Sequence, residues 1–209
     1  MSLRAALYAR FMPGFRSRRF ETFRRRLGVA DADRILDVGG YPSAWKDSGP
    51  GGPVTCLNVD IAEGSAGRFT CVRGDGCRLP FADRAFDVAY SNSVIEHVGT
   101  HEDQRRFAAE IRRVAPRLWV QTPNRRFPVE PHLVAPFVHF LPRRLQYILA
   151  RWATPWGWEN RPSAEQARAF VDGIRLLTHA EMRALFPDCE ILRERWLGMT
   201  KSFIAVRRE

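Results

Sequence analysis

The feature that most constrains the fold is a series of five short apolar runs, each followed by a residue typical of a turn. The runs span residues 34–40, 54–60, 68–75, 86–92 and 118–122. Runs of this length, rich in β-branched and aromatic residues, are typical of buried strands. Helical patterns lie between several of them, and this alternation predicts a parallel sheet with helices on both faces.

Apolar spacing and capping residues predict where the helices lie. Residues 1–27 favour two short helices that separate at Pro13-Gly14, the first with Leu3, Leu7 and Phe11 and the second with Phe20, Phe23 and Leu27 on one face. Three further helices are expected to begin with a capping box at Thr100, Ser163 and Thr178. In the helix after Thr100, Phe107, Ile111 and Val114 form the expected buried stripe.

The chain closes with two apolar runs, residues 189–197 and 200–208, joined at Gly198-Met199. So short a connection predicts an antiparallel hairpin. The expected fold class is therefore α/β, with a Rossmann-like, seven-stranded, mostly parallel sheet, a C-terminal antiparallel hairpin and helices on both faces.

The length of 209 residues suits one compact domain. We expect a basic helical arm over residues 1–30 and a single domain over residues 31–209. Residues 124–162 interrupt the alternation and contain six of the fourteen prolines and three of the six tryptophans. This stretch is too apolar for a linker and too rich in proline for one helix, and we interpret it as a lid on the substrate side.

The net charge of +10 is concentrated in two segments. Residues 1–27 hold eight Arg and one Glu, and residues 125–161 hold six Arg and two Glu, which gives +7 and +4 and leaves −1 for the rest. Such a periphery suits nucleic acid, an anionic lipid surface or an acidic substrate, and it is equally compatible with solvated Arg on exposed helix faces.

Neither a signal peptide nor a membrane-spanning segment is expected, because no long uninterrupted apolar stretch occurs. The four cysteines show no metal-binding spacing, and we interpret them as reduced thiols. These features favour a cytoplasmic protein. Peripheral contact of residues 1–27 and 125–161 with an anionic membrane remains open, and the oligomeric state is not predicted.

Polar residues follow the carboxyl ends of the first four predicted strands. In an open parallel sheet these ends form the ligand-binding edge, so we expect Asp37, Gly39, Gly40, Asp60, Asp75, Ser91 and Asn92 to lie there. Glycines allow the backbone to approach a ligand closely. Three acids at successive strand ends suit a ligand rich in hydroxyl and amine donors, and they suit a pyrophosphate badly.

These residues resemble motifs of the class I S-adenosylmethionine (SAM)-dependent methyltransferases, in particular the small-molecule branch called methyltransferase type 11. ILDVGG is similar to the glycine-rich motif, VTCLNVD to the ribose-binding strand and GDGCRLPFADRAFDVAYSNSVIEHV to the adenine-side segment. QTPN and the last helix and hairpin are also similar, so that the resemblance covers residues 33–123 and 176–208. It implies SAM as cofactor and S-adenosylhomocysteine (SAH) as product.

The resemblance implies a role for each matching residue. Asp60 would bind the ribose, Asp75 the adenine, and Gly39 and Gly40 would lie under the methionine portion near Asp37. Ser91 and Asn92 would line the floor, and the remaining cofactor contacts would come from Ile61, Gly76 and Cys77. One departure concerns the glycine motif D-x-G-x-G-x-G, which reads here as residues 37–43. Only its first glycine, Gly39, is in place, Gly40 is displaced by one position, and the bulky Tyr41 and the fixed-φ Pro42 follow.

His97, just past the fourth strand, is the first candidate for a general base and His132 the second. No metal site is predicted, because His132 and His139 have no third ligand at a suitable spacing, and both are interpreted as lid packing. The expected function is methyl transfer to an O or N nucleophile of a small-molecule acceptor, such as a natural product, sugar, quinone or lipid-like molecule.

Two alternatives remain open at this point. The basic charge suggests an RNA methyltransferase, although nucleic acid is not the expected partner because the fourth strand does not end in the tetrad that grips an exocyclic base nitrogen. The second alternative is a non-catalytic binding module with a methyltransferase-like fold, in which Tyr41-Pro42 has closed the cofactor site.

Overall fold

A computed structural model describes residues 15–45 and 51–209 of the chain. Its main feature is an eight-stranded sheet with the strand order β3-β4-β2-β1-β5-β6-β10-β9. The strands of this sheet are β1 (Ile35–Val38), β2 (Val54–Asn58), β3 (Gly64–Ala66), β4 (Phe69–Arg73), β5 (Val88–Asn92), β6 (Arg117–Pro123), β9 (Glu190–Trp196) and β10 (Met199–Arg207).

The sheet is mostly parallel, as the sequence predicts. β4, β2, β1, β5 and β6 pair in parallel, whereas β10 pairs antiparallel with both β6 and β9. The seven expected strands are all present. The eighth, β3, is an antiparallel strand of three residues at the edge beside β4. Because it is short and exposed, no apolar run in the sequence predicts it.

The turn of the C-terminal hairpin lies one residue earlier than expected. β9 ends at Trp196 and β10 begins at Met199, so Leu197 and Gly198 form the turn, with φ values of 47° and 79°. Two successive positive φ angles match the right-handed twist of the flanking strands.

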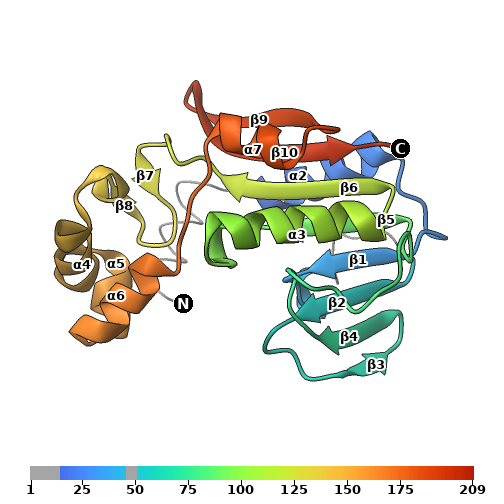
Figure 1. The fold of residues 1–209 in the computed structure, drawn as a ribbon, viewed down its shortest axis with the longest axis horizontal. Coiled ribbons are helices and arrows are strands. Elements are labelled where there is room, and N and C mark those ends of the chain that lie inside the picture. The colour runs from blue at the N-terminus through green and yellow to red at the C-terminus, as the bar shows by residue number, and fades with distance from the viewer. Residues whose placement is uncertain (1–14, 46–50) are drawn as a thin grey trace.

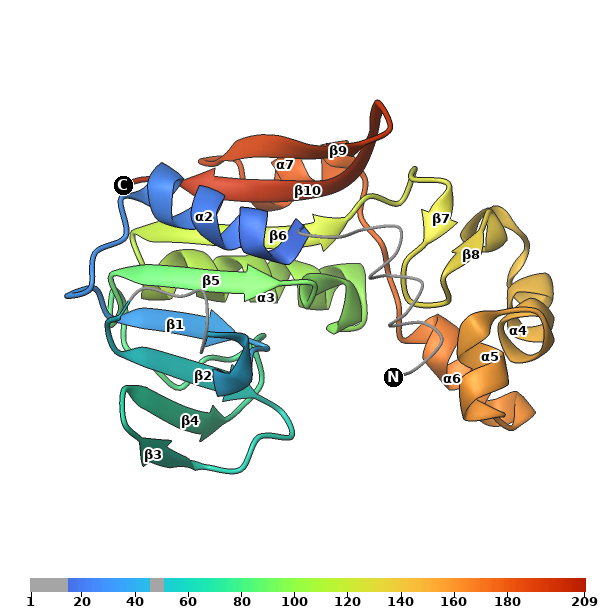
Figure 2. The ribbon, with the colours of Figure 1, turned by 180° about the vertical axis from the view of Figure 1, so that it is seen from behind.

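One face of the sheet is covered by α2 (Phe15–Leu27) and the other by α3 (His101–Val114) and α7 (His179–Leu185) (Figures 1 and 2). Phe20 and Phe23 of α2 join Trp45, Tyr90 and Trp119 in an aromatic cluster under the first face. The expected stripe of α3 is buried in the core under the second face. Of the arm, residues 1–14, with Leu3, Leu7, Phe11 and Pro13-Gly14, lie outside the described part.

The predicted helix starts are confirmed. Thr100, Ser163 and Thr178 are the N-caps of α3, α6 (Ala164–Asp172) and α7, and each forms a full capping box with the residue three positions later. The reciprocal hydrogen bonds satisfy backbone N–H groups that the first turn leaves without partners.

Residues 124–162 fold into a compact unit that continues into α6. The unit contains β7 (Val129–Glu130), β8 (Ala135–Pro136), the 3₁₀ turn η3 (Val138–Phe140), α4 (Arg143–Trp152) and α5 (Pro155–Asn160). Its own apolar core includes Trp156 of α5 and Val171 of α6. Figure 2 shows the unit beyond the arrowheads of β1, β5 and β6, at the carboxyl ends of the strands.

The four cysteines form no disulfide, and among the described residues no helix is long and apolar enough to cross a membrane.

Candidate cofactor and acceptor site

A cavity of about 240 Å³ lies at the carboxyl ends of β1 and β5. Its described lining consists of Phe20, Asp37, Gly39, Gly40, Tyr41, Ser43, Ala44, Tyr90 and Asn92. Four of the residues that the sequence predicts for the cofactor, namely Asp37, Gly39, Gly40 and Asn92, therefore share one cavity. It lies at the switch point of the sheet, because β2 and β5 pair with β1 from opposite sides.

The two glycines after β1 are required by close contacts. Gly39 has φ +84°, and a Cβ there would approach the Val94 side chain to 2.3 Å. A Cβ on Gly40 would lie 1.7 Å from Oδ2 of Asp37. That carboxylate is almost fully buried and accepts a hydrogen bond of 2.6 Å from the indole N–H of Trp45. Asp37 thus holds the loop in place from below while it also lines the cavity.

Tyr41 and Pro42 replace the glycine-rich turn with a different path. Tyr41 is extended, with φ −134° and ψ 149°, and Pro42 begins the 3₁₀ turn η1 (Pro42–Ala44). Proline suits this first position because its missing N–H would have no partner there and its φ is already fixed. The chain then turns inward, and Trp45 enters the core. The departure from the family motif therefore leaves a cavity beside Tyr41.

Asp60 and Ile61 follow β2 and differ in environment. Asp60 is exposed and accepts a short hydrogen bond from the Tyr41 hydroxyl, which raises the pKa of Tyr41. Ile61 is buried in the aromatic cluster beneath α2 and does not line the cavity. A ribose that bound Asp60 would have to displace or share the Tyr41 hydroxyl.

Asp75, Gly76 and Cys77 form a tight turn after β4, outside the lining of this cavity. Oδ1 of Asp75 accepts a hydrogen bond of 2.8 Å from the backbone N–H of Cys77. Gly76 packs against Phe107, which a Cβ would approach to 2.7 Å. Burial, together with Asp75, raises the pKa of the Cys77 thiol to about 12. Asp75 remains exposed, so its second oxygen can still face a ligand.

Ser91 and Asn92 end β5. Ser91 is fully buried, and its hydroxyl donates to the carbonyl of Val38, so it ties β5 to β1. Asn92 faces the cavity, and its Oδ1 accepts a hydrogen bond of 3.1 Å from Arg19 of α2. Arg19 also forms a bidentate pair with Glu194, and this arrangement anchors α2 beside the cavity.

The two candidate bases are brought into contact. His97 ends the 3₁₀ turn η2 (Ile95–His97), and His132 comes from the unit inserted after β6. Their ring centroids are 4.6 Å apart with the planes at 84°. Nδ1 of His132 lies 2.7 Å from Oε1 of Glu130, and its Nε2 lies 3.9 Å from Oε1 of Glu96.

Burial dominates the electrostatics of this cluster. Glu96 is fully buried, and desolvation raises the pKa of its carboxyl against the opposing effect of His132. Burial, followed by the nearby His132, lowers the pKa of His97 to about 4. His97 is therefore neutral near pH 7 and has an imidazole nitrogen that can accept a proton or bind a metal ion.

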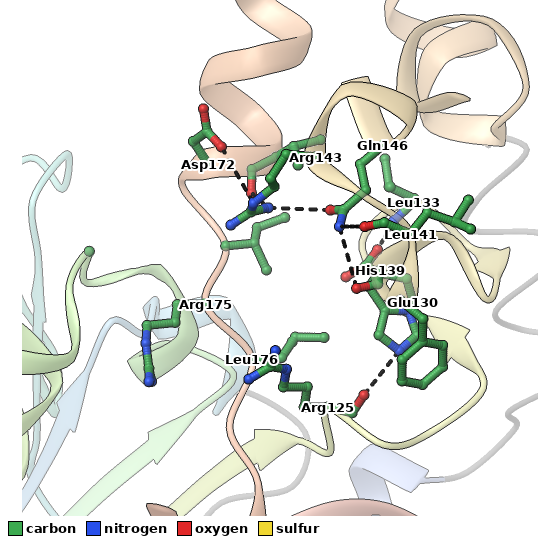
Figure 3. Close-up of a pocket in the computed structure, with 14 residues that line it drawn as sticks. Arg125, Glu130, Leu133, His139, Leu141, Arg143, Gln146, Asp172, Arg175 and Leu176 are labelled. Atoms are coloured by element: carbon green, nitrogen blue, oxygen red, sulfur yellow. Dashed lines mark hydrogen bonds and ion pairs between the residues drawn. The ribbon is translucent and has the colours of Figure 1, made fainter. Parts of the chain in front are cut away.

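A larger cavity of about 580 Å³ lies between the inserted unit and α6 (Figure 3). Arg125, Arg143, Arg175, Glu130 and Asp172 contribute charged groups to its lining, and Leu133, Leu141 and Leu176 contribute apolar ones. Arg143 and Arg175 are held by Asp172 and Glu181. Through Glu130 the cavity borders the histidine cluster.

Sequence reasoning missed Glu96, Glu130 and Arg19. Glu96 and Glu130 had weak signals, since each is an acid within two residues of a candidate histidine. Arg19 is one of eight Arg in the arm, and nothing in the pattern distinguishes it. His139, interpreted as packing, contacts the carbonyl of Arg125 at 3.0 Å through Nε2.

The strand order, the antiparallel last strand and the glycine loop at the switch point define the Rossmann-like fold of the class I SAM-dependent methyltransferases. Residues 36–117 match the family model described as "Methyltransferase domain". The match lies within residues 33–123, the first of the two stretches that carry the resemblance seen in the sequence, and agrees with it. A search of curated proteins found no match.

Solved structures agree on the fold. The Burkholderia thailandensis 1,6-didemethyltoxoflavin N1-methyltransferase, solved with 1,6-didemethyltoxoflavin and SAH, is 15% identical, with a TM-score of 0.55 and coverage of 99% of this chain and 88% of that one. The Haemonchus contortus phosphoethanolamine N-methyltransferase 2, solved with SAM, is 12% identical, with a TM-score of 0.57 and coverage of 92% and 53%.

A third match, described as a sarcosine dimethylglycine methyltransferase from Galdieria sulphuraria, is 20% identical with a TM-score of 0.42 and coverage of 51% and 45%. The chain therefore spans about half the length of two of these three relatives.

Proposed function

We propose that this chain is a SAM-dependent methyltransferase that acts on an O or N nucleophile of a small-molecule acceptor. The observation that carries the proposal is the cavity at the switch point, which brings Asp37, Gly39, Gly40 and Asn92 together. Its polar lining of carboxylate, amide and hydroxyl groups suits a ligand rich in amine and hydroxyl donors. SAM is such a ligand, and when bound it supplies a methyl group activated by the adjacent sulfonium.

The proposed cofactor contacts follow the order of the strands. Asp37 attracts the ammonium group, and Gly39 and Gly40 allow the backbone to approach the methionine portion. Asp60 accepts from the ribose, and Asp75 accepts from the adenine beside Gly76 and Cys77. Asn92 lines the floor directly, whereas Ser91 and Ile61 support it from the core.

The acceptor is proposed to enter the larger cavity, whose volume lies within the range of about 300–1,000 Å³ usual for small-molecule sites. The inserted unit then positions the acceptor and excludes water, and such positioning contributes roughly 7–11 kcal/mol in favourable cases. His97 and His132, at the border of this cavity, are proposed to receive a proton from the nucleophile. The neighbour that binds 1,6-didemethyltoxoflavin supports a small-molecule acceptor.

Thermal unfolding with SAM, SAH and NAD tests the cofactor. A ligand at 100 times its dissociation constant stabilises a protein by about 2.7 kcal/mol, which raises the melting temperature of a chain this size by roughly 5–10 °C. We expect SAM and SAH to produce this shift and NAD to produce none. Absence of a shift with both SAM and SAH would contradict the proposal and favour the non-catalytic binding module.

A second proposal concerns location at an anionic membrane. The inserted unit holds six of the ten exposed large apolar side chains in the described part of the chain, namely Phe137, Phe140, Leu145, Ile148, Trp152 and Trp158. Arg144 is exposed among them, and Arg151 stacks on Trp152 at 4.5 Å. Aromatic and apolar residues beside arginines are typical of helices that lie in a lipid–water interface.

Flotation with vesicles tests this second proposal. We expect binding to vesicles that contain anionic lipid and not to purely zwitterionic ones. The double variant Ile148→Ser, Trp152→Ser should lose binding, because both side chains are more than half exposed and their removal leaves the small core of the unit intact. Equal flotation of the variant and the wild type would contradict the proposal.

A further inference from the structure

We infer that Glu96, His97 and His132 bind a divalent transition-metal ion at the border of the larger cavity. One ligand atom of each residue lies within 4.8 Å of the others. The three residues come from two distant parts of the chain: Glu96 and His97 from η2 after β5, and His132 from the inserted unit. Their convergence is therefore a result of tertiary structure rather than of sequence neighbourhood.

The carboxylate of Glu96 points to a missing ligand. Its Oε1 is buried and has no hydrogen-bond partner in the described part of the chain, while Oε2 accepts from the Thr122 hydroxyl at 2.9 Å. Nε2 of His132, 3.9 Å away, is too far for a hydrogen bond. A buried carboxylate oxygen without a partner is costly, and a bound cation would compensate it.

Glu96 and His132 are each held by a second group, as metal ligands usually are. Thr122 orients Glu96, and Glu130 contacts Nδ1 of His132 at 2.7 Å. Glu130 is itself fixed, because its other oxygen accepts from the backbone N–H of Leu133. The ring of His97 packs against that of His132, with the centroids 4.6 Å apart. The pair Glu130 and His132 reproduces the carboxylate–histidine arrangement found behind many zinc sites.

The spacing of the ligands requires only a small adjustment. Bonds of about 2.1 Å place two ligand atoms on one ion at most about 4.2 Å apart. The distance of 3.9 Å between Oε1 of Glu96 and Nε2 of His132 is already below this limit. All three ligand atoms lie within 4.8 Å of one another, so side-chain movements of several tenths of an ångström bring every pair below it. Two imidazoles and a carboxylate suit Zn²⁺, Fe²⁺ or Mn²⁺ better than Ca²⁺, which prefers oxygen ligands.

Three protein ligands leave at least one coordination position open. Glu130 lines the larger cavity, so an oxygen of an acceptor in that cavity can complete the shell. A metal ion there would lower the pKa of a bound hydroxyl and fix its position, so that water can take the proton and His97 and His132 act as ligands in place of the proton-accepting role proposed above. This role rests on the proposed function, whereas the metal site itself does not.

Titration with Co²⁺ tests the site in the full chain after removal of metals with a chelator and without SAM. We expect one equivalent to bind with visible d–d absorption and without the intense near-ultraviolet band of thiolate ligation, and Zn²⁺ to displace it. Glu96→Gln keeps the size of the side chain and removes its charge, and we expect it to weaken Co²⁺ binding at least about tenfold. His132→Asn should have a similar effect.

His101→Asn is the matched control, because His101 is exposed at the start of α3 and lies outside the cluster. It should bind Co²⁺ as the wild type does. Glu96→Gln keeps the side-chain volume and an oxygen that can accept from the Thr122 hydroxyl, so the metal-free variant should fold and remain interpretable if His132→Asn fails to fold. Equal affinity of Glu96→Gln and the wild type, or no binding by the wild type, would overturn the inference. SAH binding measured without metal reports separately on the proposed cofactor site.

Discussion

Tyr41 combines two effects on the proposed cofactor site. Its extended backbone and the following Pro42 replace the glycine turn, and its hydroxyl donates to Asp60. Asp60 is the carboxylate proposed for the ribose, so protein and cofactor compete for the same acceptor. The hydrogen bond between the Tyr41 hydroxyl and Asp60 would therefore have to break or be shared when the ribose binds.

Tyr41→Phe should strengthen binding of SAH. The variant keeps the ring and removes only the hydroxyl. Asp60 then no longer has to give up the hydrogen bond from Tyr41 when it accepts one from the ribose. A net hydrogen bond contributes about 0.5–1.5 kcal/mol, which corresponds to roughly a 2–10-fold lower dissociation constant. Isothermal titration calorimetry with SAH measures the change. Weaker binding by Tyr41→Phe would show that the hydroxyl contacts the cofactor instead.

At the scale of helices and strands, local signals determine most of what the sequence predicts. Short apolar runs predict the strands because each buried strand needs apolar residues on both faces. The capping boxes predict the helix starts because the N–H groups of a first turn need acceptors near in sequence. The edge strand β3 lacks such a signal, since all three of its residues are exposed.

Thr100→Ala should destabilise the protein by about 0.5–2 kcal/mol. Thr100 accepts from the backbone N–H of Asp103, and its own N–H donates to Oδ2 of Asp103 at 2.9 Å. Alanine removes the hydroxyl at the start of α3, the helix that packs against the second face of the sheet. Urea unfolding provides the measurement, and Thr100→Ser, which keeps the hydroxyl, should lie within a few tenths of a kcal/mol of the wild type. Equal stability of Thr100→Ala and Thr100→Ser would contradict the capping role.

The candidate site could be predicted only in part. Asp37, Gly39, Gly40 and Asn92 lie together because strand ends meet at one edge, a rule that sequence alone can apply. The approach of His132 to Glu96 depends on how the inserted unit packs at the carboxyl ends of β5 and β6, which no periodicity encodes. Glu96 is therefore recognisable as a candidate ligand only once its buried, unpartnered oxygen is seen.

At the scale of the whole molecule, part of the positive charge lies inside the protein rather than on its surface. Lys201 is buried on β10 beside Glu194, which already forms a bidentate pair with Arg19. Burial lowers the pKa of Lys201 to about 8, with Arg19 acting in the same direction and Glu194 against it. The charged form of Lys201 therefore lowers the free energy of unfolding at pH values below its folded pKa of about 8.

Lys201→Met should be more stable than the wild type near pH 7. The difference between their free energies of unfolding, called the gap below, should narrow as the pH rises to 10. Between the folded pKa of about 8 and the unfolded value of 10.5, the unfolded wild type binds more protons, so its stability rises with pH through this residue. Each pKa unit corresponds to roughly 1.4 kcal/mol, so the gap should shrink by about 2–3 kcal/mol.

Denaturant unfolding of both proteins from pH 7 to 10 provides the measurement. The comparison with the variant cancels the cysteines, whose raised pKa values act in the opposite direction and are common to both proteins. A gap that stays constant over this range would show that Lys201 keeps an ordinary pKa.

The proposed activity requires that the cavity at the carboxyl ends of β1 and β5 binds SAM. Calorimetric titration of SAH into the wild type, Ser43→Trp and Ser65→Trp tests this binding. Ser43 is exposed and lines the cavity, so tryptophan there fills the cavity without disturbing the core, whereas Ser65 is exposed on the distant edge strand β3. We predict that the wild type and Ser65→Trp bind SAH equally and that Ser43→Trp binds at least about tenfold more weakly, a loss of about 1.4 kcal/mol. No binding by the wild type, or equal binding by Ser43→Trp, would contradict the account.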